Sequence, residues 1–191
     1  IQSMDNIING LIEKHIETIE KLKDYNSTIK EIASLFINAL KNGNKIIFFG
    51  NGGSAADAQH LSAELVGKFK KTKRRPLASI ALNTNTSIIT AVGNDFGFKD
   101  IFSYQIDALA KKGDIAVGIS TSGNSENVIS AILKAKENGI TTVGFLGRDG
   151  GQLINHVDIY LLVNSNDTAR IQETHILAGH IICEIVDNET F

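Results

Sequence analysis

The sequence predicts an α/β fold, a three-layer αβα sandwich with a five-stranded parallel sheet, preceded by N-terminal helices. Short apolar runs alternate with amphipathic helical stretches, an order typical of parallel strands covered by helices on both faces. A chain of 191 residues with 42% hydrophobic content can bury one sizeable core. No repeat, linker or low-complexity segment divides the sequence, so 1–191 is expected to form a single domain.

The N-terminal part, 1–43, is expected to form two helices ahead of an α/β core at 44–191. Gly43 is the expected C-cap of the second helix. The broad apolar stripe of the first helix indicates packing against a neighbour, such as another subunit. The apolar positions at helical spacing are Ile7, Ile8, Leu11, Ile12, Ile16, Ile19 and Leu22, then Ile29, Ile32, Leu35, Phe36, Ala39 and Leu40.

The core is expected to contain five strands, each a compact apolar run bounded by turn residues. These runs are Ile46–Phe49, Leu77–Leu82, Asp114–Ile119, Ile140–Leu146 and Val157–Val163. One helix is expected to begin at Ser54, and another is expected to be capped by Asn83-Thr-Asn-Thr86 and to run toward Val92. Two more helices are expected at Glu126–Asn138 and at about Asp167–Asp187.

Composition excludes several classes of protein. The formal charge of −2 argues against a dedicated nucleic-acid binder, and the basic run Lys68–Arg75 is interpreted as a solvated loop. Cys183 is the single cysteine, so a disulfide framework is excluded and a reducing cytoplasm is expected. No signal peptide or apolar run long enough to span a bilayer is present, and no membrane association is expected.

The stretch Lys45–Glu64 holds the first motif with chemical meaning. An apolar strand is followed by Gly50-Asn-Gly-Gly and then by a helix for which Ser54 is the expected N-cap. A strand, a glycine turn and a helix N-terminus form a backbone site suited to an anion or a polar ligand. His60 and Glu64 follow one turn apart on one helical face, either as a titratable pair beside that site or as an ordinary surface pair.

The same glycine turn fits the dinucleotide fingerprint G-x-G-x-x-A, a weak pattern by itself. A dinucleotide site would need an acidic residue at the end of the next strand. That strand ends Ala81-Leu-Asn-Thr84, without a carboxylate, so a dinucleotide cofactor is not expected.

The second motif, Ser120-Thr-Ser-Gly-Asn-Ser125, follows the third strand and precedes a helix. Hydroxyls and free amides at a helix N-terminus favour a phosphate group. Capping would need one hydroxyl, here Ser125, and four are present. Because no lysine accompanies them, the loop is not a nucleoside-triphosphate loop of the Walker type.

The third cluster lies on the last helix, where Gln172 and His180 share a face. They are separated by two turns, about 12 Å along a regular helix. An irregular helix, or residues from different subunits, would be needed to bring both to one small site. A core-facing helix with polar caps is the structural alternative.

Together, Gly50-Asn-Gly-Gly-Ser-Ala-Ala-Asp-Ala-Gln-His60, Ser120–Ser125 and Ala169-Arg-Ile-Gln-Glu-Thr-His175 resemble the sugar isomerase (SIS) domain of the phosphoheptose isomerase family. The resemblance covers the chain from Met4. It implies a homotetrameric isomerase with active sites between subunits, converting sedoheptulose 7-phosphate to D-glycero-D-manno-heptose 7-phosphate. It also implies one zinc ion per subunit, at positions matching His60, Glu64, Gln172 and His180. Implied sugar-phosphate contacts are Asn51, Gly52, Gly53, Ser54, Glu64, Asn94, Asp95, Ser120, Thr121, Ser122, Ser125 and Gln172.

Ketose–aldose isomerisation moves a proton between two carbons through an enediol, which needs a base and a second acid–base group. Glu64 and His180 are the expected catalytic pair, although zinc coordination would compete with the basicity of Glu64. The simplest expected division, or one similar to it, takes His60, Glu64 and Gln172 from one subunit and His180 from a neighbour.

Two other functions share parts of this pattern. A non-enzymatic SIS protein that regulates a replication initiator is the main alternative, and the presence of both Glu64 and His180 favours the enzyme. A sugar-phosphate sensor would carry a DNA-binding helix-turn-helix, and the two N-terminal helices show no basic recognition face.

Overall fold

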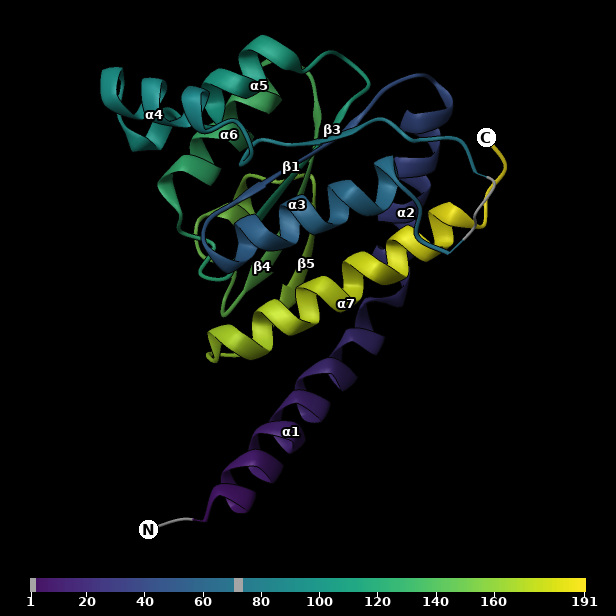
Figure 1. The fold of residues 1–191 in the computed structure, drawn as a ribbon, viewed down its shortest axis with the longest axis vertical. Helices are drawn as coiled ribbons and strands as arrows, with labels where there is room; N and C mark the ends of the chain where they lie inside the picture. Colours follow the sequence, from purple (N-terminus) through teal and green to yellow (C-terminus); the bar gives the residue numbers. More distant parts are fainter. Residues whose placement is uncertain (1–2, 71–73) are drawn as a thin grey trace.

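A computed structural model describes residues 3–70 and 74–191 as a layered α/β fold with one protruding helix (Figure 1). The strands are β1 (Ile46–Gly50), β2 (Ser79–Ala81), β3 (Ile115–Ser120), β4 (Thr141–Gly147) and β5 (Ile159–Val163). The α-helices are α1 (Met4–Glu20), α2 (Asn26–Lys41), α3 (Gly53–Val66), α4 (Thr86–Asp95), α5 (Ser103–Leu109), α6 (Glu126–Glu137) and α7 (Thr168–Asp187). Short 3₁₀ turns are η1 (Lys21–Tyr25), η2 (Phe98–Asp100) and η3 (Leu153–Asn155).

The sheet is parallel throughout, with strand order β2-β1-β3-β4-β5. Strands β1 and β3 lie side by side at its centre, and every residue of both is buried. Burial on both faces explains why these strands read as continuous apolar runs. The expected five-stranded sandwich is therefore confirmed.

The two faces of the sheet are covered by different helices (Figure 1). Helices α2, α3 and α7 pack around Phe48, Val117 and Phe145 on one face. Helices α4, α5 and α6 pack around Ile47 and Phe49 on the other. The second N-terminal helix is thus part of a sheet layer instead of preceding the core, because its apolar stripe is buried against the strands.

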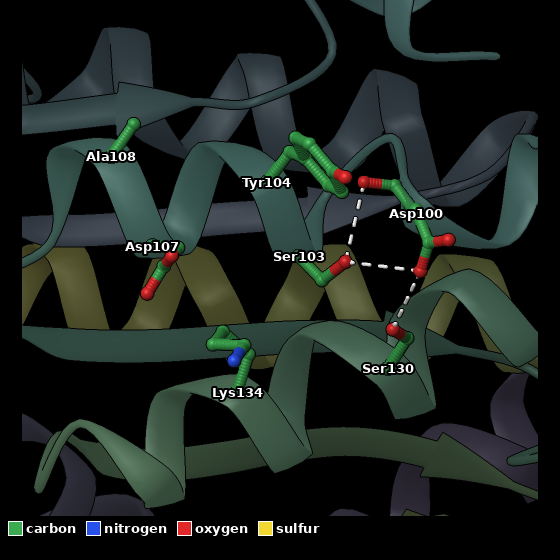
Figure 2. Close-up of a pocket in the computed structure, with 7 residues that line it drawn as sticks. All are labelled: Asp100, Ser103, Tyr104, Asp107, Ala108, Ser130 and Lys134. Atoms are coloured by element: carbon green, nitrogen blue, oxygen red, sulfur yellow. Dashed lines mark hydrogen bonds between the residues drawn. The ribbon is translucent and has the colours of Figure 1, made fainter. Parts of the chain in front are cut away.

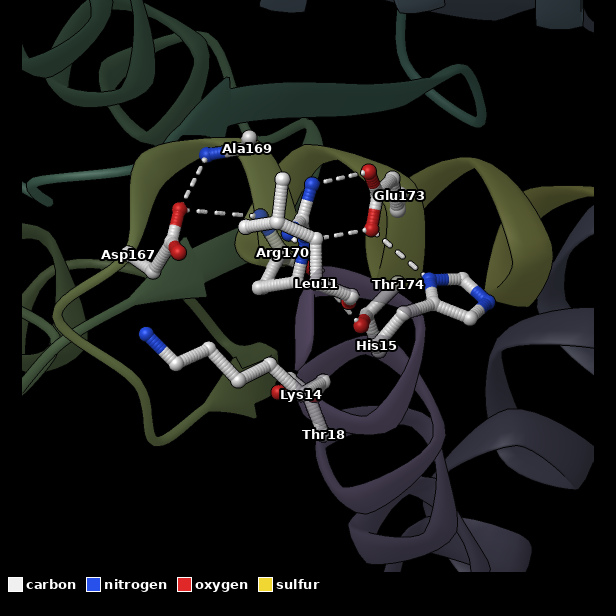
Figure 3. Close-up of polar contacts among 9 residues, drawn as sticks. All are labelled: Leu11, Lys14, His15, Thr18, Asp167, Ala169, Arg170, Glu173 and Thr174. Atoms are coloured by element: carbon white, nitrogen blue, oxygen red, sulfur yellow. Dashed lines mark hydrogen bonds and ion pairs between the residues drawn. The ribbon is translucent and has the colours of Figure 1, made fainter. Parts of the chain in front are cut away.

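Helix α1 projects away from the body of the molecule (Figure 1). The C-terminal half of α1 contacts α7 through His15, whose Nδ1 lies 2.7 Å from Glu173 Oε2 (Figure 3). Arg170 donates to both oxygens of the same carboxylate, at 2.7 Å each. These hydrogen bonds and the charge of Arg170 hold the pKa of Glu173 below its usual range, against the effect of burial. His15 therefore makes a structural contact here.

Helix α1 has an apolar side that is exposed to solvent, and the side chains on it are between 43% and 82% exposed. They are Met4, Ile7, Ile8, Leu11, Ile12 and Ile16, and we call them the α1 stripe. Among the residues that the structure describes, no helix is long and apolar enough to cross a membrane.

Several boundaries differ from the sequence expectation. Strand β2 is limited to Ser79–Ala81 at the sheet edge, and α5 is a helix that the apolar pattern does not predict. Gly43 follows the C-cap residue Asn42, with a φ of 74°. Part of the basic run, residues 71–73, lies outside the described residues.

Candidate active site

The first glycine turn connects the centre of the sheet to α3. Gly52 is the N-cap of this helix, with a φ of 57°, a conformation that favours glycine. Ser54 was expected to be the cap, but it lies buried inside the first turn. With Gly52 as the cap, the helix begins two residues earlier than a cap at Ser54 would place it.

The hydroxyl-rich loop lies beside this turn, because β3 pairs with β1 and both loops follow the carboxyl ends of their strands. The hydroxyls of Ser120 and Ser125 are 2.9 Å apart, and the Gly123 amide donates to Ser120 at 3.1 Å. Ser125 occupies the N-cap position of α6 without making a side-chain cap hydrogen bond there. Its hydroxyl faces Ser120 across the loop. Thr121 and Ser122 are half-buried beside them.

These two loops meet at the point where the chain changes direction across the sheet. From β1 it crosses to β2 through α3, and from β3 it crosses to β4 on the other side through α6. Open parallel sheets bind ligands in the crevice at such a switch point. Asn51 and Asn127 exchange two amide hydrogen bonds across it, at 2.8 and 2.9 Å. A pocket of about 310 Å³ opens here, lined by Asn51, Phe98, Lys99, Ser125, Glu126 and Asn127.

A titratable cluster forms between α3 and α7. His60 Nε2 lies 3.2 Å from Glu64 Oε1 and 3.2 Å from His180 Nε2. One donor atom from each of the three residues falls within 4.8 Å of the others, the spacing of ligands around one cation. Burial and the neighbouring His60 lower the pKa of His180, whereas Glu64 raises it.

His180 comes from the same chain as His60 and Glu64, which corrects the expected division between subunits. Helices α3 and α7 pack in parallel, so that positions far apart in sequence fall opposite each other. Because α7 is continuous, Gln172 remains about 12 Å from His180 along the axis. Gln172 instead packs against Gly53, where even a β-carbon would collide with its amide. Three of the four predicted ligands are together, and Gln172 lies at the glycine turn.

Asn94 and Asp95 end helix α4, which follows the edge strand β2. Both are exposed, and Asn94 donates to the Asp95 carboxylate at 2.8 Å. Neither is among the six residues that line the switch-point pocket.

Asp57 interacts electrostatically with His60 of the titratable cluster, although the sequence motifs do not single it out. It precedes His60 by one helical turn, and its Oδ2 is buried without a hydrogen-bond partner among the described residues. Burial raises the pKa of Asp57 to about 6, while the charge of His60 acts in the opposite direction. Its i, i+3 spacing from His60 is the signal that places both on one helix face. Lys99 and Phe98, at the pocket rim, had no comparable signal.

A second hollow, about 550 Å³, lies between α5 and α6 (Figure 2). Its main polar group is Asp100, which accepts hydrogen bonds from the hydroxyls of Ser103 and Ser130 at 3.4 Å each. Because these hydroxyls join η2 and α5 to α6, we interpret this hollow as a packing seam between helices.

The fold and the two loops are those of a SIS domain, whose family model matches residues 11–147. The match covers more than half of the chain.

Closer relatives define the branch within this class. The chain is 52% identical to a phosphoheptose isomerase of Clostridium acetobutylicum, covering 98% of this chain and 97% of that protein. It is 55% identical to one of Aquifex aeolicus, over 85% of each. The solved phosphoheptose isomerase of Neisseria gonorrhoeae superposes with a TM-score of 0.92 at 40% identity, over 98% of this chain and 100% of that one. The chain belongs to the phosphoheptose isomerase family, so the enzyme interpretation is confirmed over a non-enzymatic SIS protein.

Proposed function

We propose that this isomerase interconverts sedoheptulose 7-phosphate and D-glycero-D-manno-heptose 7-phosphate, a step toward the heptose of bacterial surface polysaccharides. The observation that carries the proposal is the cluster of His60, Glu64 and His180 on α3 and α7. The first turn of α3 borders the phosphate-suited loops, so one helix joins the two ends of a sugar-phosphate site. The relatives named phosphoheptose isomerase support the choice of substrate.

The phosphate group is assigned to the loop Ser120–Ser125. Its hydroxyls and the N-terminus of the 12-residue helix α6 offer neutral donors and a favourable dipole. In the structure Ser120 and Ser125 satisfy each other, and both can turn their hydroxyls toward a bound phosphate. Asn51, Gly52, Gly53, Ser54 and Gln172 are assigned to the sugar chain at the glycine turn, with Asn94 and Asp95 as further contacts.

Proton transfer is assigned to Glu64 and His180. Starting from the ketose, the Glu64 carboxylate takes a proton from C1 while the C2 carbonyl oxygen gains a proton, which gives the enediol. Returning the carbon proton to C2, with loss of the proton on O1, yields the aldose. His180, whose Nε2 lies 3.2 Å from His60 Nε2, serves the two oxygens. Its lowered pKa favours a neutral imidazole, which can both accept and donate.

His60, Glu64 and His180 would hold a zinc ion. Two imidazole nitrogens and a carboxylate oxygen are a donor set found in catalytic zinc sites with one open position. The unpartnered oxygen of Asp57, one turn before His60, fits the carboxylate that commonly supports a ligating histidine. When bound, zinc would supply polarisation of the substrate carbonyl.

We further propose a homotetramer whose subunit interfaces border the active sites, in the cytoplasm. The α1 stripe supports this assembly, because a projecting apolar helix needs a partner to leave water. The single buried thiol, Cys183, suits a reducing compartment.

The direct test is to mix the protein with sedoheptulose 7-phosphate and follow aldose formation by NMR, with and without a chelator. Formation of a single aldose phosphate, D-glycero-D-manno-heptose 7-phosphate, with the appearance of its C1 signals, is the expected result. A loss of activity with chelator that added zinc restores would support the metal assignment. Wild-type protein that leaves the ketose unchanged would contradict the proposed substrate.

A further inference from the structure

The geometry of the titratable cluster depends on how α3 and α7 are held together, since each helix contributes part of it. In the middle of the contact, Leu61 packs directly on Gly179, where a β-carbon would lie 2.5 Å from Leu61 Cδ2. This contact sets how closely the helices approach. It does not by itself set how far one slides along the other, because apolar surfaces have no directional bonds.

Directional bonds are supplied at the end of the contact by Arg74. Its Nε donates to Asp187 Oδ1 at 2.6 Å, at the last residue of α7. Its Nη2 donates to the main-chain oxygen of Glu64, and its Nη1 to that of Leu65, both at 3.0 Å. The side chains of Arg74 and Asp187 are only 4% and 3% exposed. One guanidinium therefore bonds the final turn of α3 and the final residue of α7.

A guanidinium group such as that of Arg74 is well suited to the C-terminal end of a helix. The last carbonyls of a helix have no partner within the helix, and the helix dipole makes this end favourable for a cation. A planar guanidinium presents its donors in a fixed fork, which a lysine ammonium cannot reproduce. The carboxylate of Asp187 neutralises the buried charge, and it also accepts from the Lys70 amide at 3.0 Å.

We propose that Arg74 and Asp187 form a clamp that positions Glu64 relative to His180, so that Arg74 is a positioning residue for proton transfer. The inference rests on the proposed function of Glu64 and His180. Arg74 bonds the main chain of Glu64 itself, so loss of this bond lets the carboxylate move relative to α7. Displacements of about 1 Å at a reacting group can reduce turnover by about 100-fold.

A matched control lies next to the clamp. Lys70 Nζ pairs with Glu184 at 2.6 Å, with the two side chains 64% and 44% exposed. Like Arg74, it bonds the segment after α3 to α7. Unlike the Arg74 guanidinium, the Lys70 ammonium is bonded to a side chain on the surface, where an ion pair contributes little to stability. Lys70→Gln is therefore expected to keep turnover within twofold of wild type.

The test variant is Arg74→Met combined with Asp187→Leu. Removing both members avoids an unpaired buried charge, which would by itself strongly destabilise the chain. Arg74→Lys is the second variant, because it keeps the charge beside Asp187 and loses the fork. In both, kcat is expected to fall at least tenfold with KM within threefold, since the phosphate loop is on other elements. A kcat within twofold of wild type in either folded variant would overturn the clamp.

A second readout does not depend on turnover. Cobalt(II) titration of the wild type, followed by visible absorption, reports the His60, Glu64 and His180 cluster directly. The Arg74→Lys protein is expected to bind Co²⁺ at least fivefold more weakly, and Lys70→Gln to match the wild type. Equal Co²⁺ affinity in all three proteins would contradict the clamp. If the wild type binds Co²⁺ but does not isomerise the heptulose phosphate, the proposed function is contradicted, and the Co²⁺ affinities of the variants still test the clamp.

Discussion

Nε2 of His180 lies 3.2 Å from Nε2 of His60, although 120 residues separate them in the chain. Their rings meet at an interplanar angle of 69°, with centroids 4.8 Å apart. The Phe69 ring covers His180 from the segment after α3, at 5.3 Å. The contact places His60, Glu64 and His180 between two helices of one subunit, and the experiments below test what this cluster does.

Replacing Glu64 by Gln is expected to abolish turnover and to spare substrate binding, because the amide keeps the shape and polarity of the side chain. Turnover by NMR and binding by calorimetry measure the two effects separately. Glu184→Gln, on the surface of α7, is the control and should behave as wild type. Activity within about tenfold of wild type would remove Glu64 from the role of base.

Ser125→Ala is expected to raise KM roughly 10- to 100-fold, because a hydrogen bond to a charged acceptor contributes about 1.5–3 kcal/mol. For the same reason, unphosphorylated sedoheptulose should be a very poor substrate. Ser87→Ala, at an exposed position on α4, provides the control. Comparable kcat/KM for the two sugars would show that the hydroxyl loop does not bind the phosphate.

Mixing Glu64→Gln chains with His180→Ala chains is expected to give inactive hybrids. Each cluster is built within one chain, so every cluster in a hybrid lacks one residue. Activity is measured after the two tagged chains are unfolded, mixed, refolded and purified together. Recovery of activity in proportion to the hybrid fraction would mean that His180 serves the site of a neighbour.

Stability is expected to fall as the pH drops from about 6.5 to about 4, owing to His175. Full burial lowers the pKa of this histidine to about 4, although its Nε2 lies 2.7 Å from the Leu146 carbonyl oxygen. The unfolded chain therefore takes up a proton in this range and the folded chain does not, which costs at most about 1.4 kcal/mol per pH unit. Urea unfolding of wild type and His175→Gln across this range should show the steeper slope in the wild type. Equal slopes would assign the acid sensitivity to other groups, and His156→Gln serves as the control.

Ile8→Glu combined with Ile12→Glu is expected to reduce the assembly below a tetramer while the subunit stays folded. Both side chains are about half exposed, so the charges cost the single chain little and an apolar interface a great deal. Light scattering after size-exclusion chromatography gives the mass, and circular dichroism checks the fold. Glu13→Gln is the control on the same helix. An unchanged mass would show that the α1 stripe is not an interface.

Local signals in the sequence were sufficient for the fold and for each motif separately. Apolar runs between glycine turns identified the buried strands, because a strand covered on both faces has no polar side. Helical spacing placed Glu64 one turn after His60, and the rise per residue correctly separated Gln172 from His180. These inferences depend on neighbours within a few positions, which the chain order itself fixes.

Tertiary packing decided what the motifs do together. Whether His180 meets His60 in one subunit depends on the parallel packing of α3 on α7, which Leu61 and Gly179 make close. The buried pair of Arg74 and Asp187 joins positions 113 residues apart, and no periodicity reports such a contact. The apolar stripe of α2 likewise predicts burial without identifying the surface that buries it, which in the structure is the sheet. An amphipathic pattern predicts that one face of a helix is buried, and only the tertiary structure identifies the surface that covers it.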